Sequence, residues 1–180
     1  NLFVFLNVVA NAEWANWRGP NMDGSSSAKN VPAKFSQDQN IRWSIDMKGK
    51  AASTPIISAG KVFITTTDEG KKELLAVAYD LKSGKEQWSK VVGKGLNQDN
   101  RSNYAGASPV SDGKNVVFFY GTGDMAVFSH DGKLRWKKNI QEEYGKFYFL
   151  WTFSSSPIIH DGKIILQVLQ RDTPVHPAQQ

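Results

Sequence analysis

The chain has 180 residues, of which 12% are aromatic, 15 are glycine and 7 are proline. No stretch has the apolar spacing of a long helix, so the pattern favours an all-β protein. Because the sequence contains no cysteine, it excludes disulfides, thiolate chemistry and cysteine-ligated zinc. The formal net charge of +5 is spread over turns instead of one basic, aromatic face, which argues against nucleic acid as a partner.

Residues 1–12 have the pattern of a signal-peptide remnant. Residues 2–9 form a short apolar run, and Ala10 and Ala12 place small residues two apart, which suits cleavage after Ala12. The run is far shorter than the ~20 apolar residues of a membrane-spanning helix. We therefore predict an exported protein, periplasmic or extracellular, with no membrane span. An amphipathic first strand is the alternative.

Residues 13–48 are predicted to be an N-terminal segment that includes the first strand. Trp14 and Trp17 lie three residues apart, and a Gly-Pro pair soon after them ends any regular element. Either the two indoles anchor this segment against the rest of the fold, or Arg18 acts as a ligand-binding cation. Alternating apolar residues predict a strand over residues 41–45.

From residue 49 onward, the chain repeats a unit of similar length. Trp88 and Trp136 are 48 residues apart, as are Pro109 and Pro157. Each unit has a proline that leads into a Gly-Lys turn, and the first two units have a second glycine turn followed four residues later by a tryptophan. A period of roughly 40–50 residues with four short strands is typical of β-propeller blades. The predicted units are a blade at 49–90, a blade at 91–138 and an incomplete blade at 139–180.

Four antiparallel strands are expected in each complete unit. The first follows the proline, the second follows the Gly-Lys turn, and the third and fourth flank the second glycine turn, with the fourth ending at the tryptophan. The second strand is predicted at residues 62–67, 116–120 and 164–169, and no helix is predicted. The fold class is therefore an all-β partial propeller of about two complete blades and part of a third. A plain antiparallel sandwich is the alternative, although it does not require identical spacings.

The second glycine turn carries a family resemblance. Residues 78–88 resemble the Ala-x-Asp-x-x-Thr-Gly-x-x-x-Trp motif of the pyrroloquinoline-quinone-type β-propeller repeats, with Ser83 in the threonine position. Residues 126–136 keep part of this motif, and Trp43 is interpreted as the end of an earlier, degenerate copy. The structural repeat residues are Ala78, Asp80, Gly84, Trp88, Ala126, Gly132 and Trp136.

The resemblance implies structural roles for these residues. In family propellers the tryptophan docks between neighbouring blades, the glycine suits a turn with positive φ, and Asp80 can bind turn amides. Residues 14–21 also resemble the Trp-x-x-Trp-Arg-Gly-Pro-Asn segment that opens the mature chain in many exported members. Family propellers have seven or eight blades, so the remaining blades of the same full-length chain are expected partners.

Two connectors, residues 94–106 and 141–152, are longer than a turn between blades requires. Long loops on a rigid scaffold often carry function. The candidate ligand-binding residues in these connectors are Arg101, Asn103, Tyr104, Lys146 and Trp151. Aromatic rings beside hydrogen-bonding groups suit a carbohydrate, a quinone or a peptide. The alternative is that residues 147–151 simply begin a buried inner strand.

The sequence shows no catalytic constellation and no metal-binding group. His130, His160 and His176 are far apart, and serines 154–156 have no neighbouring base. The favoured function is an exported, non-catalytic binding or scaffold module for a protein or cell-envelope component, similar to the family's outer-membrane assembly lipoprotein, with no cofactor evident. The alternative is a dehydrogenase dependent on pyrroloquinoline quinone and calcium, an oxidoreductase whose catalytic residues would lie mostly in blades outside this sequence.

Overall fold

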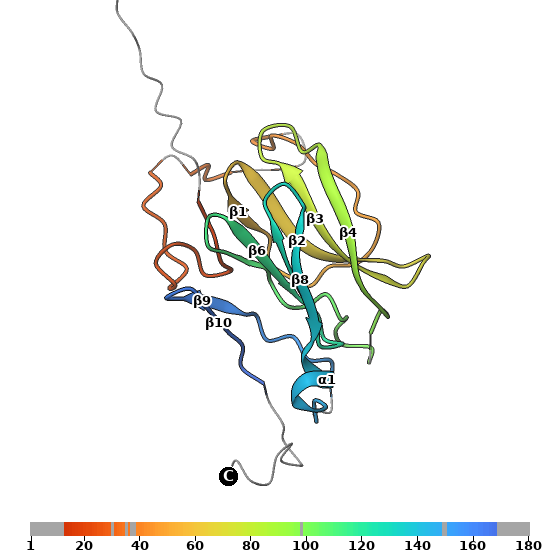
Figure 1. Ribbon diagram of the computed structural model, residues 1–180. Coiled ribbons are helices and arrows are strands. Elements are labelled where there is room, and N and C mark those ends of the chain that lie inside the picture. Colours follow the sequence, from red (N-terminus) through yellow and green to blue (C-terminus); the bar gives the residue numbers. More distant parts are fainter. Residues whose placement is uncertain are drawn as a thin grey trace, which may run out of the picture.

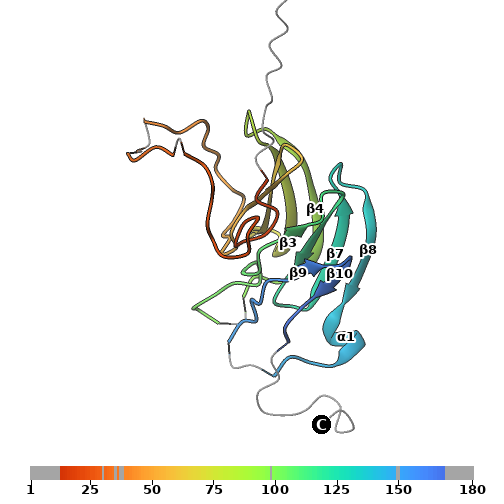
Figure 2. The same ribbon diagram turned by 90° about the vertical axis from the view of Figure 1, so that its left-hand side faces the viewer.

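The computed structural model describes residues 13–29, 31–34, 36, 39–97, 99–148 and 151–168. Two four-stranded antiparallel sheets stand next to each other, and a two-stranded hairpin lies beside the second sheet (Figures 1 and 2). The first sheet consists of β1 (Ile56–Ser58), β2 (Lys61–Asp68), β3 (Glu73–Asp80) and β4 (Glu86–Lys94). The second consists of β5 (Val110–Ser111), β6 (Asn115–Phe119), β7 (Asp124–Ser129) and β8 (Leu134–Asn139). The hairpin consists of β9 (Ile158–His160) and β10 (Lys163–Ile165).

This arrangement confirms the predicted fold class. In each sheet the spatial order of the strands equals their order in the sequence, and every neighbouring pair is antiparallel, as in propeller blades. β1 contacts β5, and β5 contacts β9, so the first strands of successive units are neighbours. The signal-peptide prediction for residues 1–12 lies outside the described residues.

Along the central strands β3 and β7, successive side chains point to opposite faces of the sheet, and on both faces they are buried. On β3, Leu74, Ala76 and Ala78 belong to the core between the two sheets, together with Phe118 and Phe128. The intervening β3 residues belong to a separate cluster on the opposite face, which also includes Ile45. β3 is therefore apolar almost throughout its length, because one sheet face meets the next blade and the other meets the N-terminal segment.

Trp88 joins the two sheets. Its side chain is 9% exposed, and its ring lies 5.6–6.0 Å from Phe63, Phe118 and Phe128, measured between ring centroids. The indole Nε1 donates a hydrogen bond of 3.0 Å to the carbonyl of His130 in the glycine turn of the next sheet. The tryptophan of one blade thus packs against the face of the following blade and shields it from solvent.

Two of the repeat glycines have a second role besides their backbone conformation. Gly84 and Gly132 have φ values of 71° and 83°. A Cβ atom added at Gly132 would lie 2.8 Å from Cγ of Trp88, and one added at Gly84 would lie 2.6 Å from Cδ2 of Trp43. Each glycine therefore leaves space for the tryptophan of the preceding unit.

Trp43 repeats the contact of Trp88 one blade earlier. Its Nε1 donates a hydrogen bond of 3.0 Å to the carbonyl of Leu81, next to the first glycine turn. The strand predicted at residues 41–45 is nevertheless wrong, because these residues form no ladder with another described strand. An extended segment is a strand only when a neighbour satisfies its backbone groups.

The other strand boundaries also differ from prediction. β4 and β8 do not end at the tryptophan but continue to Lys94 and Asn139, where they still pair with the preceding strands. β10 ends at Ile165, whereas residues 166–168 are not in a strand. Pairing with a neighbour sets these limits, and the tryptophan marks a docking position within the strand.

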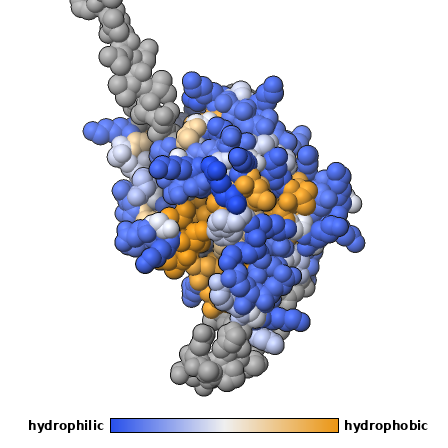
Figure 3. Space-filling view, viewed as in Figure 1, coloured by the Kyte–Doolittle hydropathy of each residue, from blue (hydrophilic) through white to orange (hydrophobic). Residues whose placement is uncertain are grey.

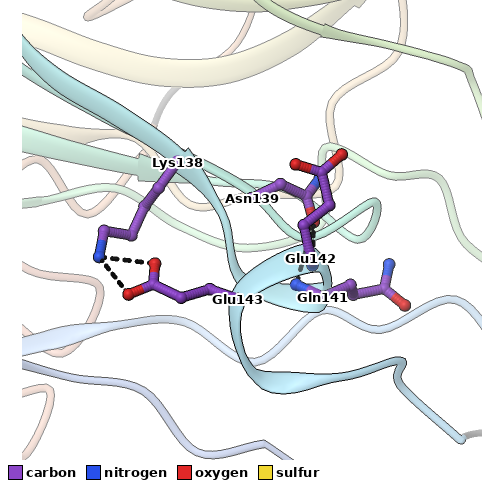
Figure 4. Close-up of polar contacts among 5 residues, drawn as sticks. All are labelled: Lys138, Asn139, Gln141, Glu142 and Glu143. Carbon is purple, nitrogen blue, oxygen red and sulfur yellow. Dashed lines mark hydrogen bonds and ion pairs between the residues drawn. The ribbon is translucent and has the colours of Figure 1, made fainter.

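A short helix, α1 (Ile140–Tyr144), corrects the prediction that no helix is present. The Oδ1 atom of Asn139 accepts hydrogen bonds from the backbone N–H groups of Gln141 (2.9 Å) and Glu142 (3.3 Å), as Figure 4 shows. This is an N-cap, and Gly145 ends the helix with a φ of 96°. One turn of helix is too short to produce apolar periodicity, so only the cap residues could have indicated it.

Apolar side chains also gather on part of the surface. Figure 3 shows a hydrophobic patch near the middle of one face, surrounded by hydrophilic residues. Leu134 and Trp136 on β8 are 50% and 38% exposed, and Ile165 on β10 is 48% exposed. Trp136 holds the repeat position of Trp88, but no glycine turn covers it among the described residues.

Candidate functional site

The two long connectors lie at the same end of the sheets and meet each other. The first follows β4, and the second contains α1 and leads to β9 (Figure 2). Asp99 on the first connector is bonded to Thr152 on the second. We call the surface formed by residues 99–104 and 144–152, where described, the connector surface.

Asp99 holds the connector surface together. Its Oδ2 atom accepts hydrogen bonds from the N–H (2.5 Å) and the hydroxyl (2.8 Å) of Thr152. Its Oδ1 atom accepts from the backbone N–H groups of Arg101 (2.7 Å) and Ser102 (3.2 Å). These bonds, with that of the Arg101 N–H foremost, lower the pKa of Asp99 to about 2, so the carboxylate is charged at neutral pH. Asp99 belongs to no recognisable motif, so its role could not be predicted from the sequence.

Arg101 and Trp151, predicted separately on the two connectors, are brought into contact. The guanidinium carbon of Arg101 lies 5.2 Å from the centroid of a Trp151 ring, within the range of a cation–π interaction. Trp151 remains 39% exposed, and the neighbouring Tyr148 is 42% exposed. Lys146 is also exposed on the second connector. The alternative, that residues 147–151 begin an inner strand, does not hold at 147, 148 or 151, which lie in no strand.

Asn103 and Tyr104 have positions that support the loop. The side-chain oxygen of Asn103 accepts a hydrogen bond of 2.9 Å from the backbone N–H of Ala105. The Tyr104 ring packs against Gly95 and Gly121, where added Cβ atoms would both lie 2.9 Å from it. Tyr104 is thus wedged between the connector and the turn before β7, with only part of its surface accessible.

A second exposed aromatic group lies beside α1. The Nζ atom of Lys138 lies 2.7 Å from Oε2 of Glu143, an ion pair drawn in Figure 4. The same Nζ atom lies 5.8 Å from the ring centroid of Trp136 and 6.0 Å from that of Tyr144. The side-chain bond to Glu143 raises the pKa of Lys138, so the ammonium remains charged at neutral pH.

The remaining titratable groups do not form a catalytic constellation within the described ranges. Ser111 Oγ lies 2.8 Å from His130 Nε2, but Ser111 is only 7% exposed and its hydroxyl also donates to the carbonyl of Asn115. The pair is therefore built into the turn region and is not open to a substrate. No cluster of three or more His, Asp or Glu side chains that could hold a metal ion is found in the described parts of the chain.

The lowered pKa of His130 predicts that the stability of the fold depends on pH. Burial, followed by the charge of Lys61, lowers its pKa from the ordinary value of 6.5, while Asp112 and Glu13 oppose this shift. Above pH 6.5 both the folded and unfolded forms carry a neutral imidazole. Below it, the unfolded chain binds a proton that the folded chain does not, so we expect the free energy of unfolding to fall until the folded pKa is passed.

His130→Gln should flatten this pH dependence. Urea unfolding of both proteins, at about pH 7.5 and about pH 5.5, measures the difference directly. Comparing the two pH profiles removes the contribution of the other groups, which both proteins share. Parallel profiles would show that the His130 proton is not linked to folding.

The N-terminal segment crosses the first strands of both sheets. Trp14 and Ile57 exchange backbone hydrogen bonds of 2.8 and 3.0 Å, and the Ala15 carbonyl accepts one of 2.8 Å from Ser111 N–H. Arg18 lies with its guanidinium carbon 5.4 Å from the centroid of a Trp17 ring. The segment is thus anchored through its backbone on β1 and β5.

The comparison with protein families agrees with this architecture. Residues 33–172 match the family model described as outer membrane protein assembly factor BamB. The comparison with curated proteins gives no match. A crystal structure of BamB from Moraxella catarrhalis aligns with a TM-score of 0.36 and 10% identity, over 65% of this chain and 41% of that one. The aligned region thus spans less than half of that protein's length.

The family model covers most of the sequence, including both four-stranded sheets and the β9–β10 hairpin. This confirms the resemblance that the glycine and tryptophan motifs indicated. The chain therefore belongs to the family of pyrroloquinoline-quinone-type β-propeller repeat proteins that is represented by the outer membrane protein assembly factor BamB.

Proposed function

We propose that this chain is a non-catalytic binding module of the cell envelope and that its connector surface binds a protein partner. The observation that carries the proposal is the contact between Arg101 and the exposed Trp151, held in place by Asp99. Tryptophan, tyrosine and arginine dominate the binding energy of protein interfaces, and a rigid surface loses little entropy on binding.

The family supports a role in the envelope. The matching model is described as an outer membrane protein assembly factor, and a protein-binding role is compatible with that description. The proposal includes export to the periplasm or the extracellular space, as the pattern of residues 1–12 suggests. No helix within the described ranges combines the length and apolar character needed to cross a membrane.

Photo-crosslinking in cells tests the proposed interface. A photoreactive amino acid replaces Lys146 on the connector surface or, as a control, Lys114 in the exposed turn between β5 and β6. We expect a discrete protein adduct from position 146, recovered in the periplasmic fraction, and none from position 114. Adding Arg101→Ala should reduce the yield of the adduct about fivefold or more, because the cation and the order it gives Trp151 are lost.

Three results would contradict this proposal. Equal labelling from the two positions would show that the connector surface has no selective partner. Adducts confined to the cytoplasm would overturn export, and an unchanged yield with Arg101→Ala would remove this residue from the interface. Far-ultraviolet circular dichroism of the variant checks that the sheets are retained.

The quinone-dependent alternative requires pyrroloquinoline quinone and calcium. Among the described residues, no group of three or more His, Asp or Glu side chains is placed to hold the cation. Incubating the full-length protein with quinone and Ca²⁺ and following dye reduction separates the two functions, since turnover would favour the dehydrogenase.

A further inference from the structure

A hollow separate from the connector pair Arg101–Trp151 lies where the N-terminal segment passes the β9–β10 hairpin. Its volume is about 500 Å³, within the usual range of roughly 300–1,000 Å³ for small-molecule pockets. The lining residues come from four separate parts of the chain and are Trp17, Ser108, serines 154–156, Ile158, Ile165 and Gln167. An indole, hydroxyl groups, an amide and two aliphatic side chains thus face one space.

The indole of Trp17 is exposed and does not belong to the hydrophobic core. Its side chain is 45% exposed, whereas the adjacent Asn16 is 9% exposed. Asn16 fixes the turn, because its Oδ1 accepts from the N–H of Arg18 (2.9 Å) and its Nδ2 donates to the carbonyl of Gly19 (2.8 Å). With the backbone bonds to β1 and β5, this turn holds Trp17 at the hollow without burying it.

The serines that line the hollow can still form hydrogen bonds to a ligand. The Oγ atoms of Ser108 and Ser156 each accept one backbone hydrogen bond of 2.9 Å, from Thr54 and Ser108 respectively. Each of these hydroxyls still has its own proton to donate. Within the described residues, no hydrogen bond is formed by the hydroxyl of Ser155, which is partly exposed. The wall therefore offers several neutral donors and acceptors at fixed positions.

The chemistry of the wall selects a ligand class. None of the described residues that line the hollow is charged, and the guanidinium carbon of Arg18 lies 5.4 Å from the centroid of the Trp17 ring. A cationic ligand would therefore lose hydration without gaining an ion pair. A sugar ring has an apolar C–H face that can lie on an indole and hydroxyl groups that exchange hydrogen bonds with serine and amide side chains. We propose that this hollow is a binding site for a neutral sugar unit, stacked on Trp17 and hydrogen-bonded to Ser155 and Gln167.

Binding of defined sugars to the full-length protein tests the site. The probes are N,N′-diacetylchitobiose, cellobiose and maltose as neutral sugars and glucosamine, protonated at about pH 6, as a charged one, each titrated by calorimetry and by saturation-transfer NMR. We expect at least one neutral sugar to bind with a dissociation constant below about 10 mM, and the cationic glucosamine to bind at least tenfold more weakly. Trp17→Ala should weaken the neutral sugar about tenfold or more, and Ser155→Ala about threefold.

Trp151→Ala is the matched control, because it removes an indole of similar exposure outside the hollow. Trp151→Ala should leave sugar affinity unchanged and reduce the yield of the protein adduct at the connector surface. Trp17→Ala should weaken sugar binding and leave the yield of the adduct unchanged. The two proposals can therefore fail independently. The sugar site is overturned if no neutral sugar binds, if Trp17→Ala binds as tightly as the unchanged protein, or if the charged sugar binds equally well. Should Trp17→Ala unfold, Ser155→Val, which narrows the hollow, must still lower the affinity.

Discussion

Trp88→Ala is expected to lower the free energy of unfolding by about 3–5 kcal/mol, the usual cost of truncating a buried tryptophan. The ring is enclosed by Phe63, Phe118 and Phe128, and its N–H satisfies the carbonyl of His130. The substitution would leave a cavity between the two sheets and an unpaired carbonyl. Urea unfolding followed by far-ultraviolet circular dichroism measures the loss.

Trp136→Ala provides the matched control. Both tryptophans lie four residues after a repeat glycine, but Trp136 is 38% exposed and Trp88 is 9% exposed. In the chain of 180 residues we expect Trp136→Ala to cost less than about 1 kcal/mol, as exposed positions usually do. Equal losses for the two variants would contradict the view that Trp88 stabilises the fold by docking on the neighbouring blade.

The fold could be predicted because its repeated features are local in sequence. The spacing between Trp88 and Trp136 set the period, and the glycine turns set the hairpins. Strand limits were predicted less well, because they depend on pairing. β4 continues to Lys94 since β3 offers partners as far as Glu73, which the tryptophan motif does not encode.

The candidate site could be predicted only in part. The length of the connectors identified Arg101 and Trp151, but the contact between them depends on the bonds of Asp99 to a residue 53 positions away. The hollow beside Trp17 joins residues from both ends of the described chain. Such contacts arise from the packing of neighbouring units and their connectors, and no spacing in the sequence records them.

Gly132→Ala is expected to destabilise the protein by about 2–5 kcal/mol, for two separable reasons. The first is the backbone, since a φ of 83° costs a residue with a Cβ about 1–2 kcal/mol. The second is steric, because the new Cβ would lie 2.8 Å from Cγ of Trp88, and overpacking of this kind costs typically about 1–3 kcal/mol more.

Gly113→Ala isolates the first of these costs. Gly113 has a φ of 85°, almost that of Gly132, yet a Cβ added there would have no neighbour within 4 Å. We therefore expect Gly113→Ala to lower the free energy of unfolding by the backbone cost alone, about 1–2 kcal/mol, in the same urea experiment. In a Trp88→Ala background the excess cost of Gly132→Ala should disappear, because the ring that it would strike is gone. If the two glycine variants were equally destabilised, or if the excess persisted without Trp88, the glycine would serve the turn alone and not the joint between blades.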